Sequence, residues 1–337
     1  MKVLSVVVPC YNSQDYMRCC IDSLLPGGND VEILVVNDGS IDKTGGIADE
    51  YQKLYPGMVK VFHQENGGHG AAVTAGIRHS TGTFIKVVDS DDWVEANAYK
   101  KVVDTLRQFA GSVQPDMVVS NFVYEKQDKK HKKAVRYINA LPRDRVFGWN
   151  ETKRFRKGQY LLMHSIIYRT NVLRESGLEL PRHTFYVDNL YAYLPLKDVK
   201  TIFYLDVDLY RYRTGHEGQS VHEETMIKNI DQQLLVNRMM ITLLDLSGVH
   251  NKRQFNYLFH YLEIVTMVSS ILLIRSGTRE NLQKEKQLWD FIRTHNRRLY
   301  NKLRYGLLGQ IVNLPGIIGR DISISVYEFS QRFFGFN

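Results

Sequence analysis

Three acidic residues stand close together in the N-terminal half of the chain. Asp89, Asp91 and Asp92 directly follow the apolar run at residues 84–88. Carboxylate oxygens are hard ligands for Mg²⁺ or Mn²⁺, and the phosphates of a bound diphosphate complete the shell of such an ion. Repulsion among three carboxylates within four residues also favours a bound cation. An alternative for Asp92 is that it caps the helix that follows.

Two further positions offer contacts to a nucleoside. Asp38, in the segment 37–40, offers a hydrogen-bond acceptor for the N–H of a base, and Tyr11 offers a flat aromatic face. Taken alone, residues 37–40 are also a typical turn sequence, because Asn, Asp, Gly and Ser are turn residues. Together with the aspartates, these residues indicate a site for a metal-bound nucleoside diphosphate.

The surrounding segments alternate between strand-like and helix-like patterns. Val-rich apolar runs are typical of strands buried on both faces, and such strands are predicted at residues 3–8, 32–36, 59–62, 84–88 and 117–119. Helices are predicted between them at residues 13–25, 43–55, 70–79 and 97–109. This alternation predicts an α/β fold with a mainly parallel sheet flanked by helices. Ligands of such sheets bind beyond the carboxyl ends of the strands.

The sequence lacks the glycine-rich loops of other nucleotide-binding classes. Pro9-Cys10-Tyr11-Asn12 stands where a dinucleotide-binding fold has its glycine-rich turn, and it does not fit the loop of a nucleotidyltransferase. No apolar run reaches the ~18 residues of a membrane span. The three cysteines form neither a disulfide framework nor a metal spacing. These features predict a cytoplasmic protein with reduced cysteines.

Positive charge is concentrated in one segment. Residues 126–157 contain twelve Lys or Arg and three acidic residues, whereas the net charge of the whole chain is +8. Such a segment suits an anionic partner, which is a phosphate-bearing substrate, an anionic membrane or nucleic acid. A solvated lysine-rich loop explains residues 126–133 equally well. A non-enzymatic nucleic-acid-binding protein is an alternative function, but it leaves the aspartates unexplained, and no nucleic acid is expected.

Taken in order, these segments resemble family 2 glycosyltransferases of the GT-A fold over roughly residues 2–220. The motifs that carry the resemblance are Val6-Val7-Val8-Pro9-Cys10-Tyr11-Asn12, Val35-Val36-Asn37-Asp38-Gly39-Ser40, Asn66-Gly67-Gly68-His69-Gly70-Ala71-Ala72, Val88-Asp89-Ser90-Asp91-Asp92, Phe185-Tyr186-Val187-Asp188-Asn189-Leu190, and Tyr210-Arg211-Tyr212-Arg213 with Gln219-Ser220. The resemblance implies an inverting transferase of the bacterial surface-polysaccharide type.

The resemblance also implies roles for single residues. A nucleoside diphosphate sugar, with UDP favoured, is expected to contact Pro9, Tyr11, Asn12, Asp38, Gly68, Asp89, Asp91 and Arg213. Asp91 and Asp89 are expected to hold Mn or Mg, which neutralises the departing diphosphate. Asp188 is expected to be the base that takes the proton from an acceptor hydroxyl. One base without a protein nucleophile implies a single displacement with inversion at C1.

The chain departs from the family pattern at several places. Val73-Thr74-Ala75 stands where the family often has Ala-Arg-Asn, so one donor contact is missing or comes from another residue such as Arg78. Val187 replaces the Glu that usually precedes the base. The Gln-x-x-Arg-Trp motif of processive synthases is absent, which favours the transfer of a single sugar to a glycan or lipid-linked acceptor.

Several alternatives stay open at this point. Asp188 could instead cap a helix that it begins, and Arg213 could be an exposed cation at a strand end. A polyprenyl-phosphate sugar synthase has the same fold, but its phosphate acceptor needs no strong base. His69 is a candidate phosphate contact or an exposed loop residue. Lys86 lies within an apolar strand, and the sequence assigns it no partner.

The region after residue 220 has a different character. Residues 1–220 are predicted to form the catalytic domain and residues 221–337 a helical region, with helical periodicity at 223–246 and 255–274. Basic residues beside apolar pairs at 293–337 suit the surface of an anionic bilayer, so a peripheral position at the inner face of the cell membrane is expected. A tail packed on its own domain is the alternative, and the sequence leaves a homo-oligomer open.

Overall fold

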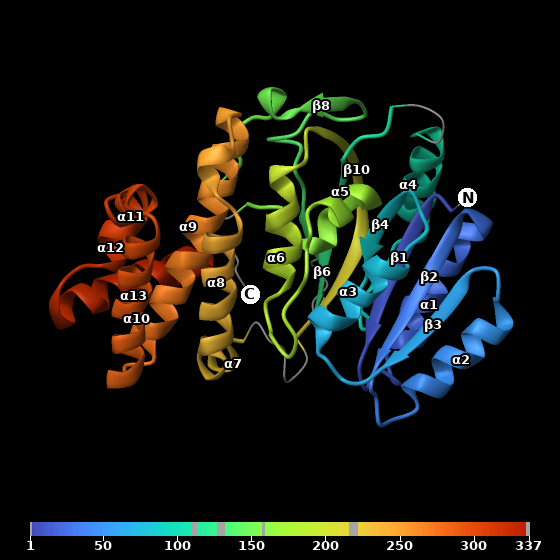
Figure 1. Ribbon diagram of the computed structural model, residues 1–337, viewed down its shortest axis with the longest axis horizontal. Coiled ribbons are helices and arrows are strands. Elements are labelled where there is room, and N and C mark those ends of the chain that lie inside the picture. Colours follow the sequence, from blue (N-terminus) through green and yellow to red (C-terminus); the bar gives the residue numbers. More distant parts are fainter. Residues whose placement is uncertain (1, 110–112, 127–131, 157–158, 216–221, 335–337) are drawn as a thin grey trace. The chain divides into compact units, whose positions relative to one another are not determined.

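The computed structural model describes residues 2–109, 113–126, 132–156, 159–215 and 222–334. The chain divides into two compact units, the first formed by Met1–Phe155 with Leu161–Gly215 and the second by Arg156–Tyr160 with His216–Asn337. Figure 1 shows their elements in sequence colours, and each unit is described by itself. The sequence predicts a domain boundary between residues 220 and 221. Residues 216–221 lie outside the described residues, so this boundary stays a prediction.

The first unit is built on one sheet, to which ten strands belong within the described residues. Along the sheet they follow the order β3-β2-β1-β4-β9-β6-β10-β5, while β7 pairs with β6 and β8 with β10. The strands are β1 (Leu4–Cys10), β2 (Val31–Asp38), β3 (Val59–Gln64), β4 (Phe84–Val87), β5 (Trp93–Val94), β6 (Met117–Lys126), β7 (Lys133–Val135), β8 (Val146–Gly148), β9 (Ile166–Arg169) and β10 (Thr201–Thr214). Strands β3, β2, β1 and β4 are parallel, as are β6 and β10, whereas β9 runs antiparallel between β4 and β6.

Helices cover both faces of the parallel strands (Figure 1). They are α1 (Met17–Leu24), α2 (Thr44–Leu54), α3 (His69–His79), α4 (Ala96–Phe109), α5 (Thr170–Glu175) and α6 (Asp188–Tyr193). Because side chains alternate along a strand, Val6 and Val8 pack in one core with residues of α1, α2 and α4, while Val7 faces α3. Every residue of β1 and β2 is buried, which explains their mainly apolar sequences. The predicted α/β fold is confirmed.

One predicted alternative is wrong. Asp92 does not cap a helix, because α4 begins at Ala96 and the side chain of Glu95 accepts the backbone N–H of Ala98 at 2.7 Å. The carboxylate of Asp92 is buried and has other partners, which belong to the site below.

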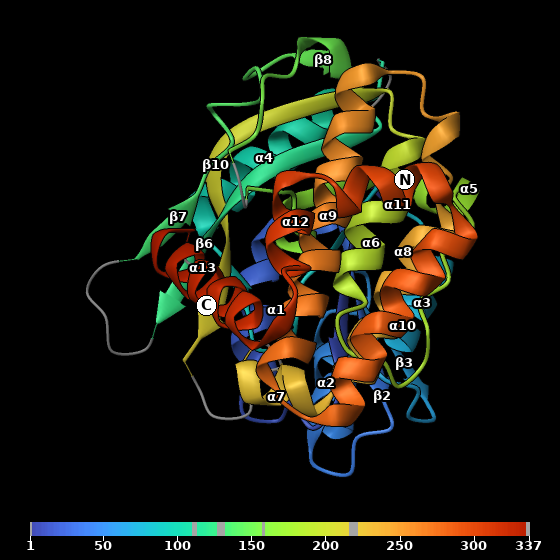
Figure 2. The same ribbon diagram turned by 90° about the vertical axis from the view of Figure 1, so that its left-hand side faces the viewer.

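The second unit is helical within its described residues. Its helices are α7 (Glu223–Lys228), α8 (Ile230–Leu243), α9 (Lys252–Arg275), α10 (Arg279–His295), α11 (Arg297–Arg304), α12 (Leu307–Val312) and α13 (Gly316–Phe334). Figure 2 shows α12 and α13 beside α9, and Arg275 of α9 forms a 2.7 Å ion pair with Glu328 of α13. The described part of the predicted membrane tail therefore packs on its own unit, and residues 335–337 lie outside the described residues.

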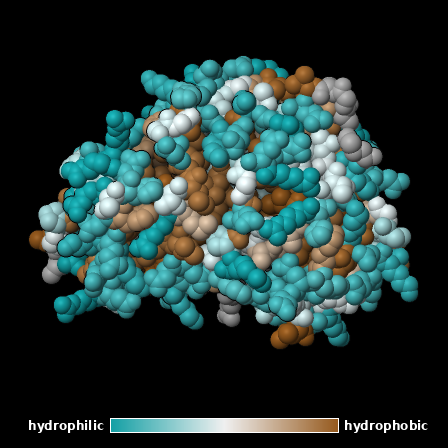
Figure 3. All heavy atoms as spheres, in the orientation of Figure 1, coloured by the Kyte–Doolittle hydropathy of each residue, from teal (hydrophilic) through white to brown (hydrophobic). Residues whose placement is uncertain are grey.

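Helix α9 is long and apolar enough to cross a bilayer by length and composition, and 78% of its most apolar stretch is buried within the protein. A buried helix of this kind is also what the core of a helical unit requires. Hydrophilic side chains cover most of the face that Figure 3 shows.

Ion pairs neutralise part of the basic segment at 126–157. Arg136 pairs with Asp208 at 2.7 Å and Arg143 with Asp206 at 3.5 Å, and both acids belong to β10, outside the segment. Lys132 pairs with Glu125 at 2.8 Å. The excess positive charge counted along the sequence therefore overstates the charge that this segment offers to an anion. Residues 127–131 and 157–158 lie outside the described residues.

The close approach of α3 to β1 gives a test of the packing. A Cβ added at Gly76 would lie 2.2 Å from Cγ1 of Val7, so Gly76→Ala should lower stability by about 1–3 kcal/mol through overpacking. The matched control is Gly46→Ala in α2, whose added Cβ would meet no heavy atom within 4 Å. Because alanine is more favourable than glycine within a helix, Gly46→Ala should raise the free energy of unfolding by roughly 0.5–1 kcal/mol. Thermal unfolding midpoints should move in opposite directions, and a shared direction would contradict this packing.

Candidate active site

The parallel strands β1, β2 and β4 end at the same edge of the sheet, and the site is built there. Tyr11 follows β1 and is 52% exposed, so its ring is accessible to a ligand. Asn12 has a φ of 48°, and its amide oxygen accepts the N–H of Ile41 at 3.0 Å, which joins the turns after β1 and β2. Pro9 lies inside β1 and is buried, one residue before the strand ends.

Asp38 ends β2 and has a carboxylate that is almost fully buried, with 2% of the residue exposed. One oxygen accepts the Gln64 amide at 2.6 Å and the N–H of Gly67 at 2.9 Å, and the other accepts the N–H of Gly68 at 2.7 Å. These bonds hold the loop that leads into α3. A carboxylate is needed here because both of its oxygens accept from N–H groups.

The same loop touches a segment more than one hundred residues away in sequence. The N–H of His183 donates to the carbonyl of Gly67 at 2.7 Å, and a Cβ at Gly68 would lie 2.8 Å from the backbone nitrogen of His183. A Cβ at Gly70 would lie 2.7 Å from the carbonyl oxygen of Pro181. Gly68 also has a φ of 83°, which favours glycine. The glycines therefore permit backbone-to-backbone contact between this loop and the chain that leads to Asp188.

Asp89 lies in the turn after β4 and has contacts with helices α3 and α1. Its Oδ1 lies 2.8 Å from Nε2 of His69 in α3, and its carbonyl accepts the thiol of Cys20 in α1 at 3.5 Å. The neighbouring Ser90 hydroxyl lies 2.8 Å from that of Ser13, which joins this turn to the one after β1. Burial raises the pKa of Asp89, but the hydrogen bond and charge of His69 outweigh it, so the pKa lies below its usual value.

Asp92 turns into the protein, away from the turn surface. Its two oxygens accept the hydroxyl of Tyr210 at 2.5 Å and the N–H of Arg213 at 2.7 Å, both from β10. Burial and the charges of Asp91 and Asp89 raise the pKa of Asp92 well above its usual value. Asp92 therefore anchors β10 beneath the acidic turn.

The structure gives Lys86 the partners that the sequence did not assign. Its ammonium is buried in β4 and donates to the carbonyl of His164 at 2.7 Å and to that of Ile166 at 3.4 Å. It also lies 5.1 Å from the centre of the Tyr210 ring, which stacks on the His164 ring. Burial lowers the pKa of Lys86 to about 7, against the opposing charge of Asp89. His164 is buried in this cluster. An isolated Lys within an apolar strand was the only sequence signal for this cluster.

The described residues bring one group of possible metal ligands within 4.8 Å of one another, namely Asp89, Asp92 and His164. Tyr210 lies among them: its hydroxyl donates to Asp92, accepts the N–H of Asp89 at 3.2 Å and has a 3.4 Å contact with the Asp89 carboxylate. This phenol accounts for the closeness of the two carboxylates. Asp91 does not belong to the group. It is half-buried at the same turn, and its charge contributes to the raised pKa of Asp92.

Arg213 lies at the same edge of the sheet. Its guanidinium is sandwiched between the rings of Tyr16 and Trp93, at 5.2 and 5.3 Å from their centres. Cation–π contacts of this kind hold the side chain in place while the charge is kept. The interpretation of Arg213 as a merely exposed strand-end cation is therefore wrong.

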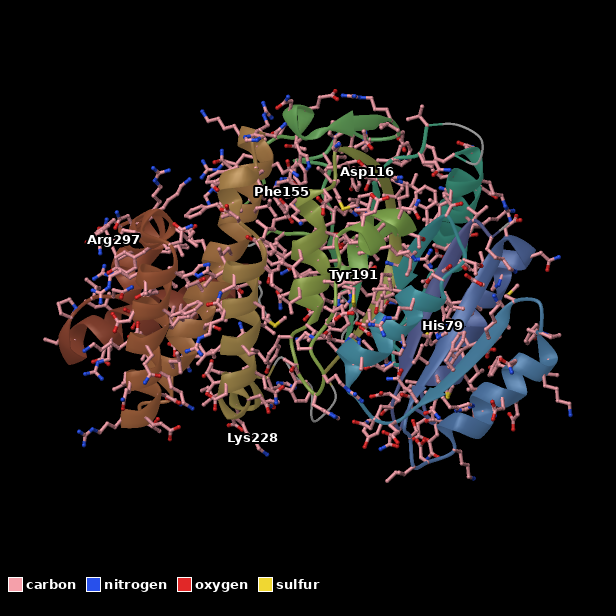
Figure 4. The ribbon with its side chains drawn as sticks, viewed as in Figure 1. His79, Asp116, Phe155, Tyr191, Lys228 and Arg297 are labelled. Atoms are coloured by element: carbon pink, nitrogen blue, oxygen red, sulfur yellow. The ribbon has the colours of Figure 1, made fainter. Side chains whose placement is uncertain are left out.

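Asp188 is the first residue of α6 and is half-buried. Val187 occupies the cap position, and no side chain caps this helix, so the alternative of a helix-capping Asp188 is wrong. The preceding Tyr186 has a φ of 65°, an uncommon value for an aromatic residue, and such backbone strain is frequent at functional sites. Burial raises the pKa of Asp188, the charge of His69 lowers it, and the net shift is upward. Tyr191, labelled in Figure 4, anchors the same helix in the core.

Arg78 does not lie with these residues. It forms an exposed 2.8 Å ion pair with Glu179 near the other end of α3, at a cavity of about 450 Å³ that Thr74 and Arg182 also line. The sequence left open whether the missing donor contact comes from Arg78, and the structure shows its guanidinium engaged by Glu179. The motif residues Gln219 and Ser220 lie outside the described residues.

Comparison with known proteins identifies the family. Residues 5–174 match the profile of glycosyl transferase family 2. EpsH of Bacillus subtilis (strain 168) is 29% identical over 254 residues, which is 68% of this chain and 64% of EpsH. The minor teichoic acid biosynthesis protein GgaA of the same organism is 26% identical over 72% of this chain and 54% of GgaA. The chain thus spans less than two thirds of these relatives. It belongs to glycosyl transferase family 2.

A solved structure defines the fold class. TarS of Staphylococcus aureus, residues 1–349, superposes with a TM-score of 0.66 at 20% identity, covering 99% of this chain and 92% of that one. The predicted GT-A fold is confirmed. A structure of the same TarS fragment in complex with UDP-GlcNAc superposes with a TM-score of 0.61.

The buried Lys86 makes stability depend on pH. Its pKa is about 7 in the folded protein and ordinarily 10.5, so the unfolded chain binds one proton more between these values. The cost of burying the charge is fully present below pH 7 and is relieved as pH rises. The stability that Lys86→Met gains over wild type should therefore be largest at pH 6 and clearly smaller at pH 9, because part of the cost is relieved between these pH values. Urea unfolding at both pH values measures the difference, and an equal difference at both would contradict this assignment.

Proposed function

We propose that this chain moves one sugar from a nucleoside diphosphate sugar, with UDP as the nucleotide, to a hydroxyl of a glycan or lipid-linked acceptor, with inversion at C1. The observation that carries the proposal is the arrangement of Asp38, Asp89 and Arg213 around one edge of the sheet, with Asp188 joined to it through the glycine loop. Hydrogen bonds between the turns support this arrangement.

The donor would lie across the carboxyl ends of β1, β2 and β4. Tyr11 would stack on the base, with Asn12 and Pro9 shaping the turn beneath it. Asp38 would hold the backbone of Gly68 in place beside the nucleotide, and the guanidinium of Arg213 would face the diphosphate. TarS, which shares the fold, has been solved with UDP-GlcNAc and with UDP, and this supports a uridine nucleotide here.

A divalent cation, Mn or Mg, fits the acidic turn. Asp91 and Asp89 would hold it, because Asp92 is already engaged by Tyr210 and the backbone of Arg213. Burial and, after it, the charges of Asp91 and Asp89 raise the pKa of Asp92, and this repulsion among the carboxylates favours a cation at the turn. When bound, the ion supplies positive charge that stabilises the departing diphosphate.

Asp188 would act as the base. Its carboxylate takes the proton of the acceptor hydroxyl as that oxygen attacks C1 from the face opposite the diphosphate, and the C1–O bond to the diphosphate breaks in the same displacement. Burial raises the pKa of Asp188, which strengthens it as a base, while the nearby charge of His69 limits the shift.

The proposed acceptor is a surface polymer or its lipid-linked precursor. GgaA is named as a minor teichoic acid biosynthesis protein, which favours a surface polymer or its lipid-linked precursor as acceptor. The second unit exposes Tyr305, Leu307 and Ile318, and the basic Arg297 and Arg298 lie in the neighbouring α11. Apolar and basic residues together suit the anionic inner face of the cell membrane, where such an acceptor is met.

The donor site is tested by two variants. Asp91→Ala should abolish the metal-dependent part of UDP binding, because the cation loses a ligand. Asp38→Ala should also weaken binding of free uridine, because the loop at Gly67 and Gly68 loses its acceptor. Calorimetry with and without Mn²⁺ measures both. Unchanged UDP affinity with Mn²⁺ in both variants would contradict the proposed site.

The base is tested by Asp188→Asn, which keeps the shape of the side chain but cannot accept a proton at neutral pH. Transfer to an acceptor should fall by roughly 10²–10⁴-fold, the usual contribution of general base catalysis, while UDP affinity stays near that of wild type. In the wild-type protein, the transfer rate should fall as the pH is lowered. Because the pKa of Asp188 is raised, this fall should begin at a higher pH than it would for an ordinary aspartate. Near-normal transfer by the variant would remove the base role and favour a lipid phosphate as acceptor.

A further inference from the structure

His69 occupies a position set by the donor loop. It is the first residue of α3, directly after Gly68, whose N–H is held by Asp38 and whose Cα packs against the backbone of His183. The backbone at His69 is therefore fixed from two sides. Its side chain extends from this fixed point to Asp89 in the turn after β4, with Nε2 2.8 Å from Oδ1.

The partners of Asp89 show why this contact matters. The hydroxyl of Tyr210 lies 2.5 Å from Asp92, accepts the N–H of Asp89 at 3.2 Å and lies 3.4 Å from Oδ2 of Asp89. Its contact with the Asp89 carboxylate is therefore the longest of the three. Among the described residues, the shortest side-chain contact with the Asp89 carboxylate is that of His69, at 2.8 Å. Oδ1 is thus held by a short hydrogen bond, whereas Oδ2 has a long contact with Tyr210.

The charges around His69 agree with a donor role. Its imidazole is in direct contact with the Asp89 carboxylate, and the charges of Asp188 and Asp91 also act on it. His69 thus belongs electrostatically to both the acidic turn and the base.

We propose that His69 is a positioning residue, which fixes the rotamer of Asp89 so that Oδ2 is presented to the donor and its cation. The inference rests on the proposed donor site and adds a residue to it. It also explains how the loop held by Asp38 acts on the acidic turn. The loop fixes the position of the first residue of α3, which is His69, and the side chain of His69 fixes the orientation of the Asp89 carboxylate.

The experiment compares two substitutions with a matched control. His69→Phe keeps a ring but cannot donate, whereas His69→Gln carries an amide nitrogen near the position of Nε2 and can donate without a charge. The control is His79→Phe at the other end of α3, labelled in Figure 4, where the ring stacks on Phe62 at 4.0 Å. Calorimetry measures UDP affinity with Mn²⁺, and donor hydrolysis measures KM and kcat.

His69→Phe should weaken UDP binding about tenfold and raise KM similarly, because the loss of one hydrogen bond to a charged group is of this order. His69→Gln should recover most of the affinity, and His79→Phe should leave it unchanged. Equal affinity of wild type and His69→Phe, or equal losses in His69→Phe and His69→Gln, would overturn the proposal. If wild type itself binds no nucleotide, the proposed donor site fails, and the role of His69 fails with it.

Discussion

The site depends on the buried carboxylate of Asp38 and the loop that it holds. Gly67 and Gly68 donate to its two oxygens, and the same two glycines lie against the backbone of His183. Since the N–H of His183 donates to the carbonyl of Gly67, a shift of the loop would break this bond or also shift the segment that leads to Asp188. One carboxylate at the end of β2 therefore sets the geometry both of the nucleotide edge and of the proposed base. Because these groups are buried, each N–H and each carboxylate oxygen needs its hydrogen-bond partner. An unsatisfied one would lower the free energy of unfolding by about 1–3 kcal/mol.

A second linkage joins β10 to the acidic turn. Tyr210 and the backbone of Arg213 both donate to Asp92, so the strand that carries the Arg213 guanidinium is tied to the turn that carries Asp89. Lys86 places a buried ammonium beneath the same turn, against the ring of Tyr210. The acidic turn is thus surrounded by cationic and donor groups, which allows several carboxylates to lie close together at a sheet edge.

Much of this architecture follows from sequence patterns, and some of it cannot. Continuous Val-rich runs predicted β1 and β2, because strands buried on both faces have no polar side, and parallel strands then bring Tyr11, Asp38 and Asp89 to one edge. The orientation of Asp92 was not predictable, since its partner Tyr210 lies 118 residues further along the chain. The antiparallel β9 was missed because a four-residue strand has little periodicity. The roles of the site residues in binding and catalysis stay predictions.

The central claim is that this sheet edge binds and activates a uridine diphosphate sugar. A hydrolysis screen of the purified chain over UDP-, GDP- and dTDP-sugars, each with Mn²⁺ or Mg²⁺, tests it most directly, because slow release of nucleotide to water does not require the acceptor. We predict metal-dependent release of UDP from at least one UDP-sugar. Release of only GDP or dTDP would contradict the choice of nucleotide. Absence of any release, together with absence of saturable UDP binding, would contradict the donor site itself.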